Sequence, residues 1–214
     1  MKRIVCYGDS NTWGYNPIGG RYASDVRWPG VLQDCLGREE FLVLEEGLCG
    51  RTTAHDSDYN PYYNGLEGLG YTLLSKAPID LVICMLGTND LHQHHVYHFY
   101  KGLSLLAYNL KNANVMYPCP VPIYTSNRGS KVLLVSPIHI GASYADKNDS
   151  FIGNKYKESY EFALYTERIA NELDLEWIDA SLYAEPSEID GLHMNSESHK
   201  NLGLAIAKKV KKLI

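Results

Sequence analysis

The sequence predicts a three-layer α/β sandwich, in which helices cover both faces of a parallel β-sheet. Short stretches rich in β-branched and aliphatic residues alternate along the chain with longer amphipathic stretches. The stretch at 79–86, with the sequence IDLVICML, is apolar almost throughout instead of at every second position, which indicates a strand buried on both faces. Right-handed crossovers between such strands favour a five-stranded parallel sheet of the flavodoxin-like order 2-1-3-4-5.

Each expected strand leads to a turn or loop at one edge of the sheet. The first strand ends at a Gly-Asp-Ser turn, and the second leads into a Glu-Gly-Leu-Cys-Gly turn. In an open parallel sheet, ligands bind at the edge formed by the carboxyl ends of the strands. We expect the strands at residues 4–7, 41–45, 79–86, 131–136 and 176–179.

The helices expected between these strands have ends marked by proline and glycine. Pro29 suits the first turn of the first helix and Gly37 stops it, while Pro78 ends the second helix. In the third, Leu103 and Leu110 lie on the inward face at helical spacing. We expect helices at 27–36, 71–76, 92–114, 155–173 and 195–213, with one further helical turn within 64–69.

The connecting loops should face the site or the surface. The loop at 15–25 is rich in Gly, Tyr and Asn and should pass over the site. The loop at 51–70 carries Asp, Asn and Tyr residues, for which a solvated rim is favoured over a cation site. The loop at 117–129 contains three prolines and, like the loop at 138–153, is a candidate interface segment or lid.

Length and charge limit the classes of protein that the chain can be. With 214 residues and a mass of 24.1 kDa, one sizeable core is expected, so we predict a single domain over 1–214. The net charge of −5 argues against nucleic acid as a partner. The lysines within 208–212 fit the end of the last helix, where cations complement the helix dipole.

Apolar runs and cysteines indicate the compartment. No stretch approaches the ~18 apolar residues of a membrane span, so no membrane partner is expected. The first strand follows Met1 closely, which leaves no room for a signal peptide. The five cysteines are odd in number and lack CxxC spacing, and Cys6 and Cys84 lie inside apolar strands. These observations predict a reduced, cytoplasmic protein.

Four short blocks stand in a fixed order along the chain: GDSNTWG at 8–14, EGLCGRTT at 46–53, GTND at 87–90 and DGLH at 190–193. Together they resemble the blocks of the SGNH (GDSL-type) hydrolases, which are named after a serine, a glycine, an asparagine and a histidine. The longer strings GDSNTWG, VRWPGVL, EEGLCGRTT and MLGTND are most similar to the arylesterase/acyltransferase branch. The resemblance implies a serine hydrolase that uses no cofactor.

Ser10, His193 and Asp190 are the candidate catalytic residues. Ser10 follows the first strand, where a serine could act as a nucleophile or merely cap the next turn. Asp190 precedes His193 by three positions, so its carboxylate can reach imidazole Nδ1 while Nε2 takes the serine proton. An isolated Asp-x-x-His is more often surface polarity or a helix cap. The combination with Ser10 favours a triad, and the resemblance assigns His193 and Asp190 as catalytic.

Three donors are expected to hold the oxyanion of the reaction: the backbone N–H groups of Ser10 and Gly50 and the side-chain amide of Asn89. A glycine permits an unusual backbone approach, and an asparagine supplies an uncharged donor. Taken alone, Gly50 could be an ordinary turn glycine and Asn89 an ordinary polar loop residue.

Trp13, Asp9 and Arg51 flank these turns and are the expected substrate-binding residues. Trp13 could stack on substrate or anchor the core, and Asp9 should orient the turn rather than react. His94 and His98 have the i,i+4 spacing of helical metal ligands, but no glutamate completes an HExxH motif. We therefore expect a polar helix start there and no metal.

The sequence thus predicts a serine esterase acting on small acyl esters, of acetyl type, through an acyl-enzyme. The resemblance implies that the acyl group can also pass to an alcohol, and that the chain forms a homo-oligomer around the entrance of the site. Two other functions stay open. A carbohydrate O-acetyl esterase is favoured by the polar aromatic loops, whereas a non-catalytic flavodoxin-like sugar-binding or small-molecule-binding module leaves the set of site residues unexplained.

Overall fold

A five-stranded parallel sheet forms the centre of the computed structural model, which describes residues 1–56, 60–125, 131–147 and 153–214. The order in the sheet is β2-β1-β3-β4-β5, and neighbouring strands are parallel. The predicted sandwich and strand order are therefore confirmed. The strands are β1 (Lys2–Gly8), β2 (Phe41–Gly47), β3 (Leu81–Met85), β4 (Val132–Ser136) and β5 (Glu176–Asp179).

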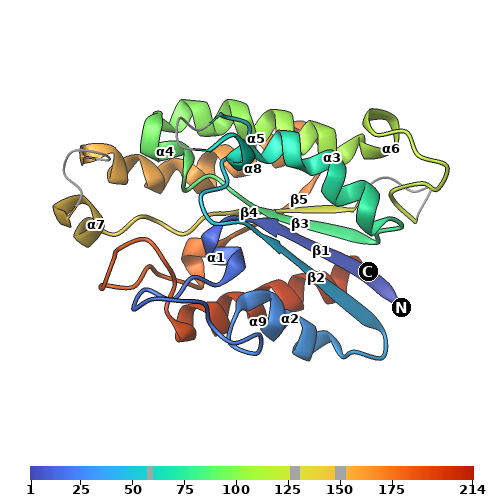
Figure 1. The fold of residues 1–214 in the computed structure, drawn as a ribbon, viewed down its shortest axis with the longest axis horizontal. Helices are drawn as coiled ribbons and strands as arrows, with labels where there is room; N and C mark the ends of the chain where they lie inside the picture. The colour runs from blue at the N-terminus through green and yellow to red at the C-terminus, as the bar shows by residue number, and fades with distance from the viewer. Residues whose placement is uncertain (57–59, 126–130, 148–152) are drawn as a thin grey trace.

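Helices cover both faces of the sheet (Figure 1). The side chains of β3 alternate between the two resulting cores: Val82 and Cys84 belong to one, and Leu81 and Ile83 to the other. Both sets are buried, which explains why this strand is apolar at consecutive positions. One face carries α2 (Trp28–Leu36) and α9 (Ser196–Leu213), and the other carries α3 (Gly65–Lys76), α5 (Val96–Lys111) and α8 (Phe162–Glu172).

The strand register brings the ends of three strands to one place. Gly8, the last residue of β1, pairs with Gly47 of β2 on one side and with Met85 of β3 on the other. The turns that follow these strands carry Ser10, Gly50 and Asn89. Residues far apart in the sequence therefore meet at one edge of the sheet.

The helix before β3 is longer than predicted. The sequence predicted a turn within 64–69 and a separate helix at 71–76, but α3 is continuous from Gly65 to Lys76. Its start is fixed by Asn64, whose side chain accepts a hydrogen bond of 3.0 Å from the N–H of Leu66. The glycines of this segment lower helix propensity, which hid the first half of the helix.

The prediction of one helix over 92–114 is wrong. The chain forms α4 (Asp90–Gln93), α5 and α6 (Ala113–Met116), and His94 and His95 between the first two have extended backbones. The carboxylate of Glu158 accepts a 2.7 Å hydrogen bond from the N–H of Val96 and so supports the start of α5. Glu158 lies 62 positions further along the chain, where local sequence patterns cannot reveal the contact.

The segments around β4 and α8 also differ from the predictions. The predicted loop at 138–153 contains α7 (Ala142–Lys147), and the predicted helix at 155–173 begins as a 3₁₀ helix, Gly153–Glu161. Further 3₁₀ turns lie at Pro61–Tyr63 and Ala180–Leu182. Parts of three predicted loops, at 57–59, 126–129 and 148–152, lie outside the described residues, including Asp58 and Tyr59.

No helix within the described ranges is long and apolar enough to cross a membrane.

Candidate active site

Ser10 stands on a tight turn between β1 and a four-residue helix, α1 (Ser10–Trp13). The carboxylate of Asp9 caps this helix by accepting a 2.9 Å hydrogen bond from the N–H of Asn11. A Cβ at Gly8 would stand only 2.0 Å from an atom of α1. A glycine is therefore required for the helix to start so close to the end of the strand, and this placement delivers the Ser10 hydroxyl to the sheet edge.

The side chains of Ser10, His193 and Asp190 form a continuous hydrogen-bonded row. Nε2 of His193 lies 2.9 Å from the Ser10 hydroxyl, and Nδ1 lies 2.7 Å from a carboxylate oxygen of Asp190. With Asp190 ionised, Nδ1–H donates to it, which leaves Nε2 as the acceptor for the serine proton. The structure thus brings the three predicted catalytic residues together from opposite ends of the chain.

Asp190 is held in its ionised form by its surroundings. Partial burial raises the pKa of this carboxyl, but hydrogen bonds from the imidazole and N–H of His193 and from the N–H of Leu192 outweigh that effect. The net pKa lies below its ordinary value. A carboxylate that stays charged can stabilise an imidazolium at His193.

Gly50 and Asn89 come from the turns after β2 and β3. Gly50 has a φ of +83°, and a Cβ there would stand 2.7 Å from the ring of Tyr63, so both backbone and space require glycine. The Asn89 amide donates a 2.9 Å hydrogen bond to the carbonyl of Arg51. Because an amide nitrogen carries two protons, this bond joins the two turns and leaves a second donor.

The sequence and fold of known proteins agree with this arrangement. The model of the GDSL-like lipase/acylhydrolase family matches residues 6–200. The chain belongs to this family. It is a serine ester hydrolase.

Three solved structures illustrate the similarity. The inhibitor-bound aryl esterase of M. smegmatis has 32% identity and a TM-score of 0.89, with 100% of both chains covered. A carbohydrate acetylesterase family member from Sinorhizobium meliloti has 32% identity and a TM-score of 0.89, covering 100% of this chain and 99% of that one. A lipase/acylhydrolase from Enterococcus faecalis, at 22% identity, a TM-score of 0.68 and coverage of 99% and 96%, shares the fold. No curated protein matches the chain significantly.

Arg51 holds together the ends of the two strands that lead into the Ser10 and Gly50 turns. Its guanidinium donates a 2.9 Å hydrogen bond to the carbonyl of Gly8, hydrogen-bonds the carbonyl of Glu46, and lies 4.1 Å from the ring centroid of Tyr7. The side chain is buried and ties the ends of β1 and β2 together. The substrate-binding role expected of Arg51 stays a prediction.

Asp9 is likewise part of the support. It is 1% exposed, and burial raises the pKa of its carboxyl to about 6, although the hydrogen bond from Asn11 and the charges of His193 and Arg51 act in the opposite direction. This placement agrees with the expected orienting role. A direct contact with substrate stays a prediction.

Tyr15 places an aromatic ring beside His193, and the ring of Trp13 lies 6.5 Å from that of Tyr15. Trp13 is half-buried, with the Arg21 guanidinium 4.8 Å from its ring centroid. The ring of Tyr15 lies 4.3 Å from the His193 ring and is tilted by 34°. Sequence reasoning placed the loop at 15–25 over the site but did not single out Tyr15, because nothing local shows which of its aromatic residues turns inward.

Asp90 is a second buried carboxylate that sequence reasoning missed. It accepts hydrogen bonds from the N–H of Thr53, at 3.0 Å, and from the Thr53 hydroxyl. Burial raises the pKa of this carboxyl, against the hydrogen bonds from Thr53 and the nearby His55. Since Asp90 directly follows Asn89 and Thr53 lies three positions after Gly50, these bonds join the two turns that are expected to hold the oxyanion.

The predicted histidine pair is part of a three-ring cluster. His94 ends α4 and His98 lies in α5, so they do not share one helix, yet their rings stack at 4.7 Å. The ring of His55 lies 4.9 Å from that of His94, and its Nε2 lies 2.8 Å from the carbonyl of His98. In the part of the chain that the structure describes, no group of three or more potential ligands has the geometry of a metal site.

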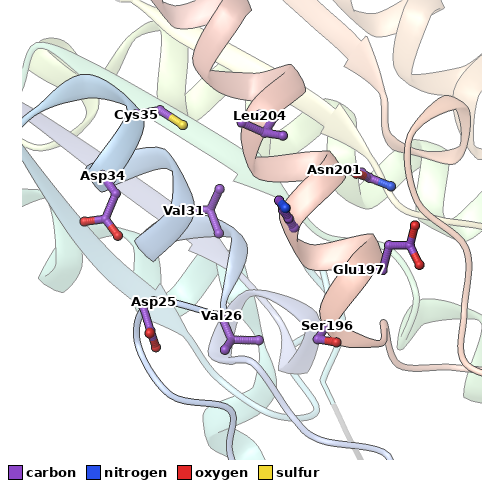
Figure 2. Close-up of a pocket in the computed structure, with 10 residues that line it drawn as sticks. Asp25, Val26, Val31, Asp34, Cys35, Ser196, Glu197, Asn201 and Leu204 are labelled. Carbon is purple, nitrogen blue, oxygen red and sulfur yellow. The ribbon is translucent and has the colours of Figure 1, made fainter.

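A surface pocket of about 680 Å³ lies between α2 and α9 (Figure 2). Val26, Val31 and Leu204 form part of its apolar lining, and Asp34 and Glu197 are among its polar residues. None of the triad residues lines it. The candidate active site is therefore located by the hydrogen bonds around Ser10 and not by this pocket.

Proposed function

We propose that this esterase hydrolyses small acyl esters, of acetyl type, through an acyl-enzyme on Ser10. The observation that carries the proposal is the 2.9 Å contact between His193 Nε2 and the Ser10 hydroxyl. A serine hydroxyl becomes an effective nucleophile when a neighbouring base takes its proton. Asp190 orients that base through its 2.7 Å contact with Nδ1.

In the first half of the reaction, Ser10 Oγ bonds to the carbonyl carbon of the ester and its proton moves to His193 Nε2. The carbonyl oxygen becomes an oxyanion that the N–H groups of Ser10 and Gly50 and the Asn89 amide stabilise. When the carbonyl re-forms, the bond to the alcohol oxygen breaks. His193 gives its proton to the departing alcohol, and the acyl-enzyme remains.

In the second half, a water molecule attacks the acyl-enzyme and gives its proton to His193. The same donors stabilise the second oxyanion, and its collapse breaks the bond to Ser10 Oγ. The proton on His193 returns to Ser10, and the carboxylic acid leaves. The cycle needs no cofactor, since the His193 imidazole accepts and then donates the proton of each step.

Acyl transfer to an alcohol is the finer part of this proposal. An alcohol that occupies the place of water gives a new ester by the same second step. The ring of Tyr15 against His193, at 4.3 Å, covers one side of the base and supports a site with restricted water access. We also propose that Trp13 contacts the substrate and that a homo-oligomer narrows the entrance.

We propose a reducing compartment such as the cytoplasm for this enzyme. The five cysteines are all free thiols, and burial raises the pKa of Cys6 and Cys84, which makes them unreactive.

A carbohydrate O-acetyl esterase is the second candidate function. The carbohydrate acetylesterase family member from Sinorhizobium meliloti, with 32% identity and a TM-score of 0.89, favours it. The mechanism at Ser10 would be the same, and only the alcohol part of the ester would differ. The two candidates separate when kcat/KM for p-nitrophenyl acetate is compared with kcat/KM for acetylated xylo-oligosaccharides.

The test of the mechanism is p-nitrophenyl acetate hydrolysis by the wild type, Ser10→Ala and His193→Ala. We expect each variant to lose on the order of 10⁴-fold or more in kcat, because the residues of a triad act as a unit. Ser75→Ala, at an exposed serine of α3, is the matched control and should retain wild-type kcat. Activity retained by Ser10→Ala would contradict the proposal.

A further inference from the structure

The side chain of Asn11 joins the nucleophile helix to both peptide groups that flank His193. Its amide nitrogen donates a 3.2 Å hydrogen bond to the carbonyl of Leu192, and its amide oxygen accepts a 2.9 Å hydrogen bond from the N–H of Met194. Asn11 is 2% exposed. Buried hydrogen bonds of this kind are costly to lose, because water does not replace them.

These bonds reach between segments that nothing in the local sequence connects. Asn11 is the residue after Ser10, whereas Leu192 and Met194 lie more than 180 positions further along the chain. The backbone N–H of Asn11 is itself bonded to Asp9, which fixes the start of its helix. The Asn11 side chain therefore links the turn that carries Ser10 directly to the loop that carries His193.

Most of the other hydrogen bonds of the histidine loop join its own residues, and one, from the N–H of Gly141 to the carbonyl of Gly191 at 2.7 Å, ties it to the segment after β4 rather than to α1. The carboxylate of Asp190 accepts hydrogen bonds from Nδ1–H and the backbone N–H of His193. The N–H of Ser187 donates a 2.7 Å hydrogen bond to the carbonyl of His193. These contacts orient the imidazole within the loop without setting its distance from Ser10. Besides the Ser10 contact with His193, the two bonds from Asn11 connect this loop to α1.

We propose that Asn11 is a positioning residue that sets the Ser10 to His193 distance, an inference that rests on the proposed function. The site requires an amide, since one peptide carbonyl needs a donor and one peptide N–H needs an acceptor. An ionised aspartate supplies only acceptors, and leucine supplies neither donor nor acceptor. Displacements of about 1 Å at reacting groups can cost on the order of 10²-fold in rate.

Gln33 provides a matched control elsewhere in the fold. Its amide nitrogen donates a 3.1 Å hydrogen bond to the carbonyl of Phe41, and its amide oxygen accepts a 2.8 Å hydrogen bond from the N–H of Val43. Gln33 is 5% exposed and joins α2 to β2. It is therefore a buried amide with the same pair of backbone contacts, away from the triad.

The experiment compares Asn11→Leu, Asn11→Asp and Gln33→Leu with the wild type in p-nitrophenyl acetate kinetics and in the rate of fluorophosphonate labelling. We expect Asn11→Leu to lose about 10²-fold in kcat and in labelling rate with KM changed by less than about threefold, and Asn11→Asp to lose less. Gln33→Leu should lower the melting temperature and keep kcat within about twofold. The downfield proton NMR signal of His193 Nδ1–H should persist in folded Asn11→Leu, because the Asp190 contact is internal to the loop.

Three results would overturn the inference. The first is kcat within about threefold of the wild type in folded Asn11→Leu. The second is an equal loss of kcat in Gln33→Leu, and the third is that neither Asn11 variant folds while Gln33→Leu does. Failure of the proposed function looks different, because the wild type would then neither turn over substrate nor be labelled.

Discussion

Ser10 and His193 lie 2.9 Å apart although 183 positions separate them, and each is held by residues with no chemical role of their own. Asp9 caps the helix that begins at Ser10, and the Asn11 side chain hydrogen-bonds the backbone groups before and after His193. Arg51 ties the strand ends below the turn. At the scale of single residues, the site is a set of short contacts between backbone groups and buried polar side chains.

Gly50 offers a direct test at this scale. Alanine there would meet the ring of Tyr63 at 2.7 Å and would have a φ of +83°. We expect the turn to move and the N–H of Gly50 to shift away from the proposed position of the oxyanion. We expect Gly50→Ala to lose about 10²- to 10³-fold in kcat, measured with p-nitrophenyl acetate.

Gly37 supplies the control for backbone strain. It has a φ of +82°, and a Cβ there would meet nothing within 4 Å. Gly37→Ala should cost about 1–3 kcal/mol of unfolding free energy, because its φ of +82° and ψ of 141° suit glycine alone, and it should leave kcat unchanged. Equal kinetics for the two alanine variants would contradict the role given to Gly50.

The blocks of the sequence, through their resemblance to the SGNH hydrolases, were sufficient to predict the three residues that the structure joins. Ser10 lies just after β1, and Asp190 and His193 lie in the loop before α9. Asn11 lies inside the first of these blocks, yet its role depends on a loop more than 180 positions away. Tyr15 was hidden for the same reason. Contacts at long sequence separation leave no local pattern.

Among the elements, α2 and α9 pack closely and enclose a histidine. His199 is fully buried, its Nδ1 accepts a 3.4 Å hydrogen bond from the N–H of Trp28, and a Cβ at Gly203 would stand 2.7 Å from Val31. Burial, together with the charges of Arg27 and His193, lowers the pKa of His199 to about 3. The folded protein therefore keeps this imidazole neutral.

This burial predicts a loss of stability in acid. The unfolded imidazole binds a proton near its ordinary pKa of 6.5 and the folded one does not, so stability present above that pH is lost as the pH falls toward 3. Between about pH 8 and pH 5, His199 should cost about 2 kcal/mol of unfolding free energy. His199→Asn, which can still accept from Trp28, should lack this loss in urea unfolding.

The raised pKa of Asp9 has the opposite sign. Its folded pKa of about 6 lies above the ordinary 3.8, so the folded state gains stability as the pH falls through this range. This contribution is present in both the wild type and His199→Asn, and it cancels in their difference. An equal acid loss in the two proteins would contradict a neutral, buried His199.

The elements that the sequence predicted well carry their own boundary signals. Pro29 and Gly37 frame α2, and Asn195 accepts a hydrogen bond at the start of α9, so both helices fall within one residue of the expected range. The predicted helix at 92–114 failed because a distant carboxylate, Glu158, supports the start of α5. Burial on both faces made the parallel strands visible as apolar runs.

At the scale of the whole molecule, one sheet edge gathers turns from the beginning, the middle and the end of the chain (Figure 1). Arg51 binds the carbonyl of Gly8, Asn89 binds the carbonyl of Arg51, and Asn11 binds the carbonyl of Leu192. The strand order decides which turns become neighbours, and these bonds fix how they meet. The fold therefore determines the relative positions of Ser10, His193 and the proposed oxyanion donors.

This arrangement should make one serine of the chain reactive. The most direct measurement is the intact mass of the wild type and of Ser10→Ala after incubation with a fluorophosphonate, followed by peptide mapping. We expect one phosphonyl group per wild-type chain, on Ser10, and none on Ser10→Ala. An unlabelled wild type, or labelling that persists in Ser10→Ala, would contradict this expectation.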